Sequence, residues 1–236
     1  MKTKSINWLF IIICVVALFV GCAPKAETDL LECDAATMTQ FPYNENGVIV
    51  AKHQKITPVS EHPGMVKIET YYVNEGKPIT VRAYEMCRTE VEATDSVVWS
   101  LQPSSTSGRL DWVLPVTEGF KKENYLGMNN TDYGGGIPVV DLWQKDGGVA
   151  IGLIEPVLRM ISMPVEWKRY ENKVSMSLRY EFEWPVELNT GDTLHTFTAF
   201  RYEHKGDFFN ALRAFSEEKK KDAGIELPAS EPEAFE

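Results

Sequence analysis

Positive charge is scarce in this chain. The 236 residues include 24 Lys and Arg against 34 Asp and Glu, which gives a formal net charge of -10. A nucleic-acid-binding protein needs a basic surface that displaces counterions from phosphates, and no basic stripe is present in the sequence. The sequence therefore excludes nucleic acid as a partner. Its hydrophobic share of 44% is ordinary for a globular protein.

Histidine and cysteine are also rare, with 4 of each. The histidines His53, His62, His195 and His204 are scattered and lack the paired spacing that builds a metal site. The sequence contains neither a phosphate-binding loop nor a G-x-S-x-G nucleophile motif. It thus predicts no metal, no nucleotide and no other cofactor.

One long apolar run stands at the N-terminus. The stretch MKTKSINWLFIIICVVALFVGC has two lysines, then an apolar run from Trp8 to Val20, then Gly21 and Cys22. This order of positive charge, apolar run and small residue is typical of an export signal. The alternative is a transmembrane anchor, because the run is nearly long enough to span a bilayer.

The same residues resemble a bacterial lipoprotein signal, although Phe19 stands where leucine is commonest. The resemblance implies that residues 1–21 are removed and that Cys22 carries a lipid that anchors the chain to a membrane. The expected location is the bacterial cell envelope, in the periplasm or at the cell surface. Cys33 and Cys87 remain, and an exported compartment permits a disulfide between them, but their spacing has no signature and the pairing stays open.

Residues 22–40 are small and polar, and we expect them to form a flexible tether. Over residues 41–206, alternating segments are separated by Gly, Pro, Asn or Asp, as in a protein of short strands. The clearest segment runs from Val174 to Trp184 and predicts one buried and one solvated face, with Trp184 in the core. Because helices do not intervene, we predict an all-β fold, an antiparallel β-sandwich (supersandwich).

One C-terminal amphipathic helix is expected over residues 207–225. Asp207 is the predicted N-cap, Phe208, Leu212 and Phe215 form an apolar stripe, and Gly224 is the predicted stop. Residues 226–236 contain prolines and acidic residues, and we interpret them as a linker or a truncated end.

Glycines, amides and aromatic residues gather in the stretch ENYLGMNNTDYGGGIPVVDLWQKDGG, from Glu123 to Gly148. With GVAIGLIEP and GDFFNALRAFSEEKKKDAGI, this stretch resembles the N-terminal β-sandwich region of bacterial alpha-galactosidase (melibiase) type glycoside hydrolases. The resemblance covers most of the chain after the tether and is sharpest from Asn124 to Ile225. It implies a sandwich that lies beside a catalytic (β/α)₈ barrel.

The chain has no alternation of strands and helices over the ~250 residues of a usual barrel. The resemblance therefore implies a non-catalytic sandwich, either truncated or working with a barrel on a separate polypeptide, and inactive alone. The alternative is a stand-alone carbohydrate-binding or structural surface lipoprotein. The expected partners are a galactoside-like carbohydrate, the catalytic barrel and, through the lipid, a membrane.

Within the glycine-rich stretch, Asn129, Asn130, Asp132 and Tyr133 are the expected sugar-facing residues. Sugar hydroxyls donate and accept hydrogen bonds, so amides and a carboxylate can pair with them, while a ring covers the apolar face of the pyranose. The three consecutive glycines would permit a close approach of the backbone. The alternative is a structural turn, with Asp132 and Asp141 as capping residues.

The aromatic residues permit two interpretations. Exposed rings stack on sugars, whereas buried rings fill the core of a sandwich. The residues concerned are Trp99, Trp112, Trp143, Trp167, Trp184, Tyr125 and Tyr133. We expect core filling for Trp184, and both interpretations stay open for the two tyrosines.

Overall fold

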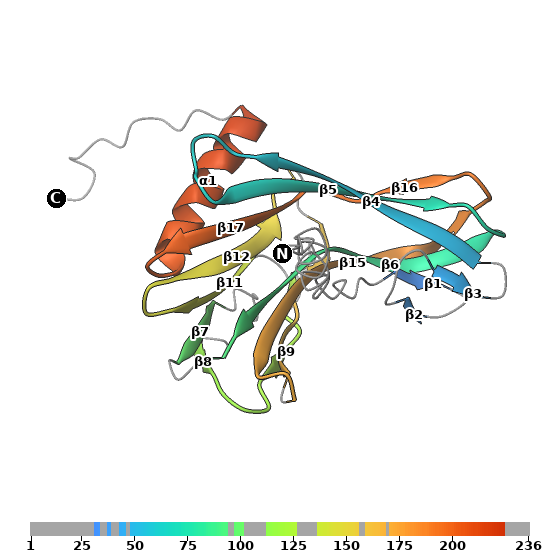
Figure 1. The fold of residues 1–236 in the computed structure, drawn as a ribbon. Coiled ribbons are helices and arrows are strands. Elements are labelled where there is room, and N and C mark those ends of the chain that lie inside the picture. The colour runs from blue at the N-terminus through green and yellow to red at the C-terminus, as the bar shows by residue number, and fades with distance from the viewer. Residues whose placement is uncertain are drawn as a thin grey trace, which may run out of the picture.

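Two antiparallel β-sheets and one α-helix form the part of the chain that the structure describes (Figure 1). The computed structural model describes residues 31–33, 37–38, 43–45, 48–93, 97–101, 112–126, 136–155, 159–168 and 170–224, with side chains from residue 48 onward. The two sheets share a core, and the helix packs on the outer face of one of them. The predicted antiparallel β-sandwich with one C-terminal helix is confirmed.

The first sheet, sheet A, has eight strands. They are β1 (Leu31–Cys33), β2 (Thr37–Met38), β6 (Ile79–Glu92), β9 (Lys121–Lys122), β10 (Tyr125–Leu126), β13 (Ile161–Ser162), β14 (Val165–Lys168) and β15 (Lys173–Leu188). Their order is β10-β13-β15-β6-β1-β2, and β14 pairs with both β15 and β9. The two long strands β6 and β15 form the centre of this sheet.

The second sheet, sheet B, has nine strands. They are β3 (Tyr43–Glu45), β4 (Val48–Pro58), β5 (Met65–Asn74), β7 (Val98–Leu101), β8 (Val113–Val116), β11 (Val139–Gln144), β12 (Gly147–Leu153), β16 (Thr193–His195) and β17 (Ala199–Lys205). Their order is β3-β4-β5-β17-β12-β11-β7-β8, and β16 pairs with β5.

Strands β1 and β2 lie within residues 22–40, where the sequence predicts a flexible tether. β1 pairs with β6, and Leu31 lies opposite Tyr84. Pairing at a sheet edge uses backbone groups and needs no long apolar pattern, so periodicity does not reveal it. Residues 31–33 and 37–38 therefore belong to sheet A rather than to a tether.

The backbone register also bears on the open question of a disulfide. Cys33 lies opposite Val81 in β6, six residues from Cys87. At a strand rise of ~3.3 Å per residue, the two cysteine backbones lie ~20 Å apart. A disulfide needs Cα atoms within ~7 Å of each other. The described backbone therefore argues against a Cys33–Cys87 pair.

Strand β5 shows how alternation builds the core between the sheets. Ile68, Thr70 and Tyr72 are buried, while the residues between them are partly or fully exposed. The Tyr72 hydroxyl donates to the carbonyl of Glu85 (2.9 Å), and the Thr70 hydroxyl donates to the carbonyl of Met86 (3.2 Å). Met86 lies at a β-bulge in β6, where the ladder with β15 is interrupted. Side chains of sheet B thus satisfy carbonyls of sheet A at this bulge.

Helix α1 (Phe208–Ala223) covers the outer face of sheet B (Figure 1). Asp207 caps its first turn by accepting a backbone hydrogen bond, and Gly224 ends it in the left-handed region at φ 61°. Phe215 stacks on Phe200 of β17, with ring centroids 5.6 Å apart. The predicted helix caps are confirmed.

The helix buries the middle strands of sheet B, β11, β12 and β17, on their second face as well. Every residue from Val139 to Trp143 in β11 is buried, because sheet A covers one face and α1 covers the other. Strands that are covered on both faces have continuous apolar runs rather than alternating ones. This position explains the apolar run IPVV, residues 137–140, where the chain enters β11.

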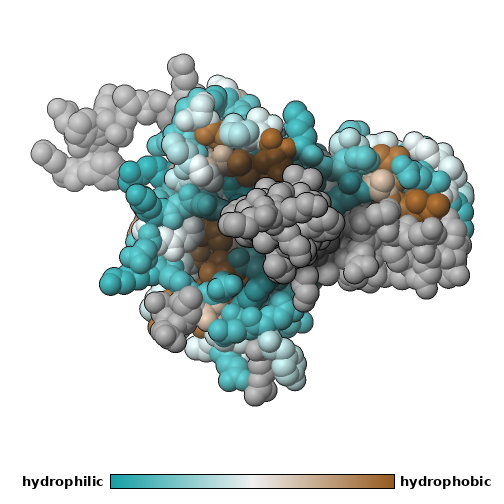
Figure 2. Space-filling model, viewed as in Figure 1, coloured by the Kyte–Doolittle hydropathy of each residue, from teal (hydrophilic) through white to brown (hydrophobic). Residues whose placement is uncertain are grey.

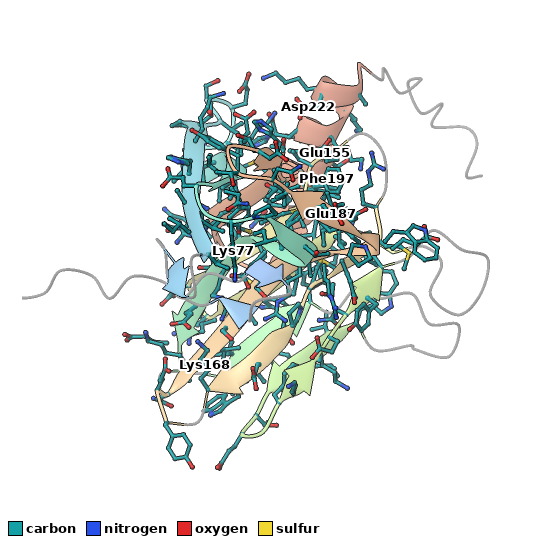
Figure 3. The ribbon with its side chains drawn as sticks, turned by 90° about the vertical axis from the view of Figure 1, so that its right-hand side faces the viewer. Lys77, Glu155, Lys168, Glu187, Phe197 and Asp222 are labelled. Carbon is teal, nitrogen blue, oxygen red and sulfur yellow. The ribbon has the colours of Figure 1, made fainter. Side chains whose placement is uncertain are left out.

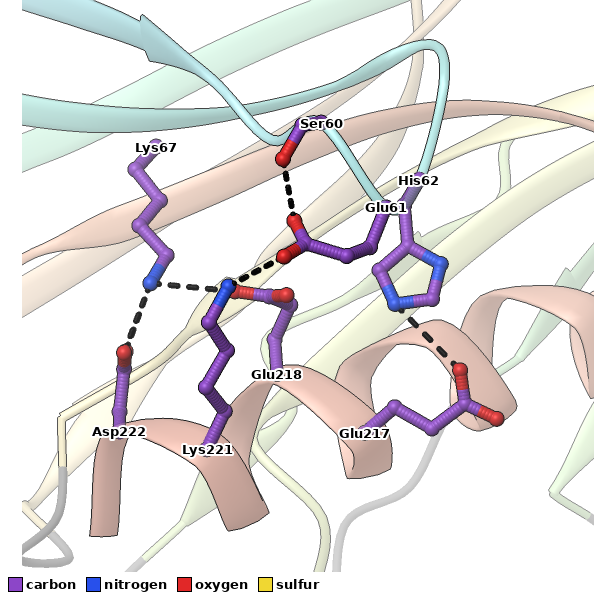
Figure 4. A network of polar contacts seen from close by, with 8 residues as sticks. All are labelled: Ser60, Glu61, His62, Lys67, Glu217, Glu218, Lys221 and Asp222. Carbon is purple, nitrogen blue, oxygen red and sulfur yellow. Dashed lines mark hydrogen bonds and ion pairs between the residues drawn. The ribbon is translucent and has the colours of Figure 1, made fainter. Parts of the chain in front are cut away.

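Ion pairs hold the C-terminal half of α1 on sheet B (Figure 4). Lys67 of β5 lies 2.8 Å from Asp222 and 3.2 Å from Glu218, whose side chain is only 3% exposed. Lys221 lies 2.7 Å from Glu61, and the hydrogen bonds from Lys221 and Ser60 lower the pKa of Glu61 to about 2. Because Glu218 is buried, its contact with Lys67 avoids an unpaired charge inside the protein.

The first half of β15 differs from its predicted pattern. Ser175 and Ser177, expected on a solvated face, are buried. Ser175 lies opposite Glu90, and Glu90 forms ion pairs with Lys168 and Lys173. Figure 3 shows Lys168 at the lower end of the view. Long paired side chains thus lie beside Ser175 on the outer face of sheet A.

The second half of β15 corrects the prediction that Trp184 lies in the core. The Trp184 side chain is 77% exposed. Glu181 pairs with Ala83 and Val186 pairs with Val81, so residues 182–185 face a single residue of β6 and leave the ladder. Pro185 lacks the amide that a regular ladder would use. Alternation predicted the strand, but a bulge turned this ring outward.

Hydrophilic residues cover most of the described surface in Figure 2, and its hydrophobic areas are separate patches. Among the described residues, no helix has the length and apolar character needed to cross a membrane. The apolar run from Trp8 to Val20 and the predicted lipidation site Cys22 lie outside the described residues.

A buried pair of titratable groups lies on the face of sheet B that α1 covers. His204 Nε2 and Asp141 Oδ1 are 3.0 Å apart, and both side chains are 0% exposed. Gly148 of β12 lies directly opposite His204, and a Cβ there would lie 2.5 Å from the Trp143 Cβ. Gly148 thus lies between Trp143 and His204 in the register of the sheet and lets β11 approach closely. Asp141 therefore lies inside a strand and does not cap a turn.

Burial and mutual attraction set the protonation of this pair. Burial raises the pKa of Asp141, and the hydrogen bond from His204 offsets this only in part. Burial also acts to lower the pKa of His204, but its hydrogen bond with Asp141 and the carboxylate charge outweigh burial and raise that pKa. The other oxygen of Asp141 has no hydrogen-bond partner within the described residues. A protonated His204 is therefore the main compensation for a buried carboxylate.

We expect the pair to make stability depend on pH. A histidine whose pKa is raised by folding stabilises the protein fully below pH ~6.5, the pKa of histidine in the unfolded chain. This stabilisation is lost as the pH rises through the pKa of the histidine in the folded protein. The melting temperature of the wild type should therefore fall as pH increases from 6.5 to 9. A double variant Asp141→Asn, His204→Gln should show a flatter profile over that range in thermal denaturation followed by circular dichroism. Identical slopes for the two proteins would contradict this role.

Candidate carbohydrate-binding site

The predicted sugar-facing residues Asn129, Asn130, Asp132 and Tyr133 lie outside the described residues. The structure shows where their segment starts and where it ends. Residues 127–135 follow β10 in sheet A and precede β11 in sheet B. The segment therefore connects the two layers of the sandwich, and its start in sheet A can be described in detail.

Asn124 anchors the start of this segment. It has a positive φ of 51°, a conformation that asparagine tolerates better than most residues. Its side-chain amide donates to the Met163 carbonyl (2.9 Å), and the Met163 amide donates back to the Asn124 carbonyl (3.3 Å). These contacts hold the chain at the edge of sheet A immediately before Tyr125.

A row of opposed residues crosses sheet A from this point. Tyr125 of β10 lies opposite Ser162 of β13. Ser162 lies opposite Arg179 of β15, which lies opposite Glu85 of β6. We call these four residues the sheet A row. They lie on the outer face, because their chain neighbours belong to the core between the sheets.

A buried carboxylate organises one end of the sheet A row. Glu85 is 1% exposed and binds Arg88 through both oxygens, at 3.0 and 2.8 Å. Arg179 Nε lies 3.6 Å from the nearer oxygen of Glu85 and makes no hydrogen bond within the described residues. The Arg179 side chain is 34% exposed. Its guanidinium is thus placed by charge; Nε itself is buried, and only the exposed part of the guanidinium can meet a further group.

The other end of the sheet A row is an accessible ring. Tyr125 is 50% exposed. Burial of part of the ring raises the pKa of its phenol, and the charges of Glu123 and Glu181 add to this. The phenol is therefore neutral at physiological pH and can donate a hydrogen bond. Of the two interpretations left open for Tyr125, the structure favours an exposed ring.

The chemistry of the sheet A row suits binding rather than bond cleavage. An exposed ring, a serine hydroxyl and a guanidinium can contact a polyhydroxylated ligand. Acid and base catalysis needs a carboxyl group that can exchange a proton with the substrate. Glu85 is buried and held by two arginines, so it does not meet that need. The described residues also contain no group of three or more potential metal ligands.

The predicted sugar-stacking aromatics fall into two classes. Trp143 is 8% exposed, and Trp167 packs against the core between the sheets. Trp99 and Trp112 are exposed by 40% and 37%. Tyr133 lies outside the described residues. Core filling is therefore confirmed for Trp143 and Trp167, while sugar stacking by the exposed rings stays a prediction.

A hollow of about 840 Å³ lies beside α1 and β17. Two pairs of its titratable side chains contact each other. Arg201 lies 2.6 Å from Glu203, and His62 lies 3.4 Å from Glu217. None of its described lining residues belongs to β10 or β11, the strands that flank residues 127–135, so we place the candidate site at the sheet A row, where that segment begins.

The sequence did not reveal the contact between Glu85 and Arg179. Alternation along β15 puts Arg179 on the outer face, which is where it lies. The residue opposite depends on the register between β15 and β6, and a bulge at Met86 shifts that register. A sequence pattern describes one strand at a time and does not specify such a shift.

Comparison with known proteins relates the chain to enzymes that act on galactose-type sugars. No protein-family model matches it. In an alignment of 184 positions it is 24% identical to "A type blood alpha-D-galactosamine galactosaminidase" of Flavonifractor plautii. The match covers 68% of this chain but only 16% of that enzyme.

Solved structures show the same fold in part of larger enzymes. The GH36 alpha-galactosidase AgaA of Geobacillus stearothermophilus, in complex with raffinose, matches with a TM-score of 0.54 at 12% identity. That match covers 78% of this chain and 31% of AgaA. The galactosidase domain of the alpha-galactosidase-sucrose kinase AgaSK matches with a TM-score of 0.50 at 15% identity, over 66% of this chain and 22% of AgaSK. The chain therefore has the fold of one part of these alpha-galactosidases and spans about a third of their length or less.

Proposed function

We propose that the chain is the non-catalytic β-sandwich of an alpha-galactosidase-like glycoside hydrolase, and that it supports a carbohydrate active site together with a catalytic barrel. The observation that carries this proposal is the asymmetry of the matches. They cover 68% and 78% of this chain but only 16% and 31% of the enzymes. The chain corresponds to a part of such an enzyme, and the described part contains one helix.

The substrate class follows from the relatives. Their names indicate enzymes for alpha-linked galactose and galactosamine. Both are pyranoses with several hydroxyl groups and an apolar face, which suits the ring, hydroxyl and guanidinium of the sheet A row. We propose an alpha-linked galactoside or galactosaminide as the sugar.

The glycine-rich segment would supply the sandwich's contacts with that sugar. We propose that Asn129, Asn130, Asp132 and Tyr133 face the sugar. The support is their place in the chain, because their segment begins directly after Tyr125 and Leu126 at the end of the sheet A row. Tyr125 would extend the same surface.

A second candidate function is a stand-alone carbohydrate-binding or structural lipoprotein at the cell surface. It is favoured by the apolar run from Trp8 to Val20 that precedes Cys22, and by the exposure of Trp99 and Trp112. In both candidate functions we propose that a lipid on Cys22 anchors the chain in the bacterial cell envelope.

The purified chain alone should not hydrolyse aryl alpha-galactosides or aryl N-acetyl-alpha-galactosaminides. When tagged and captured from its native cells after mild crosslinking, it should bring down a barrel-containing hydrolase with that activity. Mass spectrometry and a chromogenic assay of the eluate check both points. Turnover by the pure chain would contradict the non-catalytic assignment. Sugar binding with no hydrolase partner would favour the stand-alone lipoprotein.

In the assembled enzyme, Asp132→Ala and Tyr133→Ala should each lower kcat/KM about tenfold, a loss of ~1.4 kcal/mol, because a sugar contact is removed. The melting temperature should stay nearly unchanged. Tyr170→Ala is the matched control, since Tyr170 is 99% exposed and lies in a turn before β15. Lost stability with intact kinetics would show that the segment is a structural turn.

The mature protein should carry a diacylglycerol-modified cysteine at its N-terminus. Mass spectrometry of the N-terminal peptide should find the lipid in the wild type, and a Cys22→Ser variant should lack it and leave the membrane fraction. An unmodified wild-type cysteine with the apolar run retained would instead indicate a transmembrane anchor.

A further inference from the structure

A second aromatic surface lies where α1 begins on the outer face of sheet B. Trp99 of β7 pairs directly with Trp143 of β11. The Trp143 ring lies 5.2 Å from the Phe208 ring, and Phe208 stacks on Phe209 with centroids 4.3 Å apart. We call these four residues the aromatic ledge. Trp99 and Phe209 remain 40% and 63% exposed, although Trp143 is buried.

A hollow of about 400 Å³ opens beside the aromatic ledge. Its lining residues are Val97, Trp99, Trp143, Gln144, Lys145, Gly206 and Asp207. This volume is within the ~300–1,000 Å³ of small-molecule sites in proteins. One wall is an indole, and the other lining groups include a carboxylate, an ammonium and an amide. The hollow therefore combines a flat apolar surface with both donors and acceptors.

Two polar groups of this hollow, Asp207 and Gln144, are held in place by the fold. Asp207 is the N-cap of α1, and its Oδ1 accepts from the Phe209 amide at 3.1 Å. A carboxylate has two oxygens with several acceptor sites, so this contact leaves capacity for a ligand. The Gln144 side-chain amide donates to the carbonyl of Glu92 at 3.0 Å, which positions that side chain. Lys145 is exposed in the turn after β11.

We propose that this hollow is a binding site for one hexopyranose unit, with the Trp99 indole against the apolar face of the sugar. Asp207 accepts hydrogen bonds from sugar hydroxyls and Lys145 donates to them. A lone anion or cation would not explain the indole wall, and a purely apolar ligand would leave the carboxylate and ammonium unpaired. This inference goes beyond the proposed function, because the site is formed by this chain alone and needs no catalytic barrel.

Isothermal titration of the full chain with methyl alpha-D-galactopyranoside, N-acetyl-D-galactosamine and raffinose tests the proposal. The wild type should bind at least one of these sugars saturably. Trp99→Ala should weaken that binding at least tenfold, since the stacking surface is lost. Asp207→Asn keeps a good N-cap residue and should weaken binding by about threefold or more through loss of the charged acceptor. Both variants should keep the wild-type circular dichroism spectrum and melting temperature.

Trp184→Ala is the matched control, because Trp184 is an exposed tryptophan in the β15 bulge and does not line the hollow. Its affinity should equal that of the wild type. The proposal is overturned if the wild type binds none of the sugars, if Trp99→Ala binds normally, or if Trp184→Ala weakens binding equally. It is also overturned if a captured protein partner covers Trp99 and abolishes sugar binding. Failure to capture a hydrolase would contradict the proposed function but would not affect this titration.

Discussion

The antiparallel pairing of β6 with β15 is the constraint on which most other features depend. A bulge at Met86 interrupts the ladder, and Thr70 and Tyr72 from sheet B donate to carbonyls there, so the pairing also connects the two sheets. The same register puts Arg179 opposite Glu85 and forms one end of the sheet A row. Shifts in register thus determine both how the layers join and which polar groups meet.

The middle of sheet B is covered on both sides, and burial of a charged group there is unfavourable unless the group has a partner. Apolar residues fill most of it, but Asp141 and His204 are buried together and compensate each other. Gly148 lies opposite His204, and a side chain at this position would collide with β11. At the edge of the same interface, Lys67 neutralises Glu218. Polar groups are therefore buried under α1 only where a partner of opposite charge is within reach.

The described surfaces suit ligand contact more than chemistry on a ligand. In the sheet A row the one buried carboxylate is bound by arginine, while Tyr125 and Arg179 remain accessible. At the aromatic ledge, Trp99 stands beside a hollow with a carboxylate and an ammonium. Both arrangements support the proposal that the sandwich binds sugar while another domain cleaves the glycosidic bond. The partial coverage of the related enzymes points in the same direction.

Local sequence determined the strands, the helix and its caps, because alternation and capping depend on residues close together in the chain. It also located Asp207 and Gly224 correctly at the ends of α1. It did not predict the exposure of Trp184, the burial of Ser175 or the short strands within residues 22–40. Only the tertiary structure decided these three features, and it alone brought together the Asp141–His204 pair and the residues of the sheet A row. Each depends on register, on bulges or on a covering layer, and these are set by residues far away in the chain.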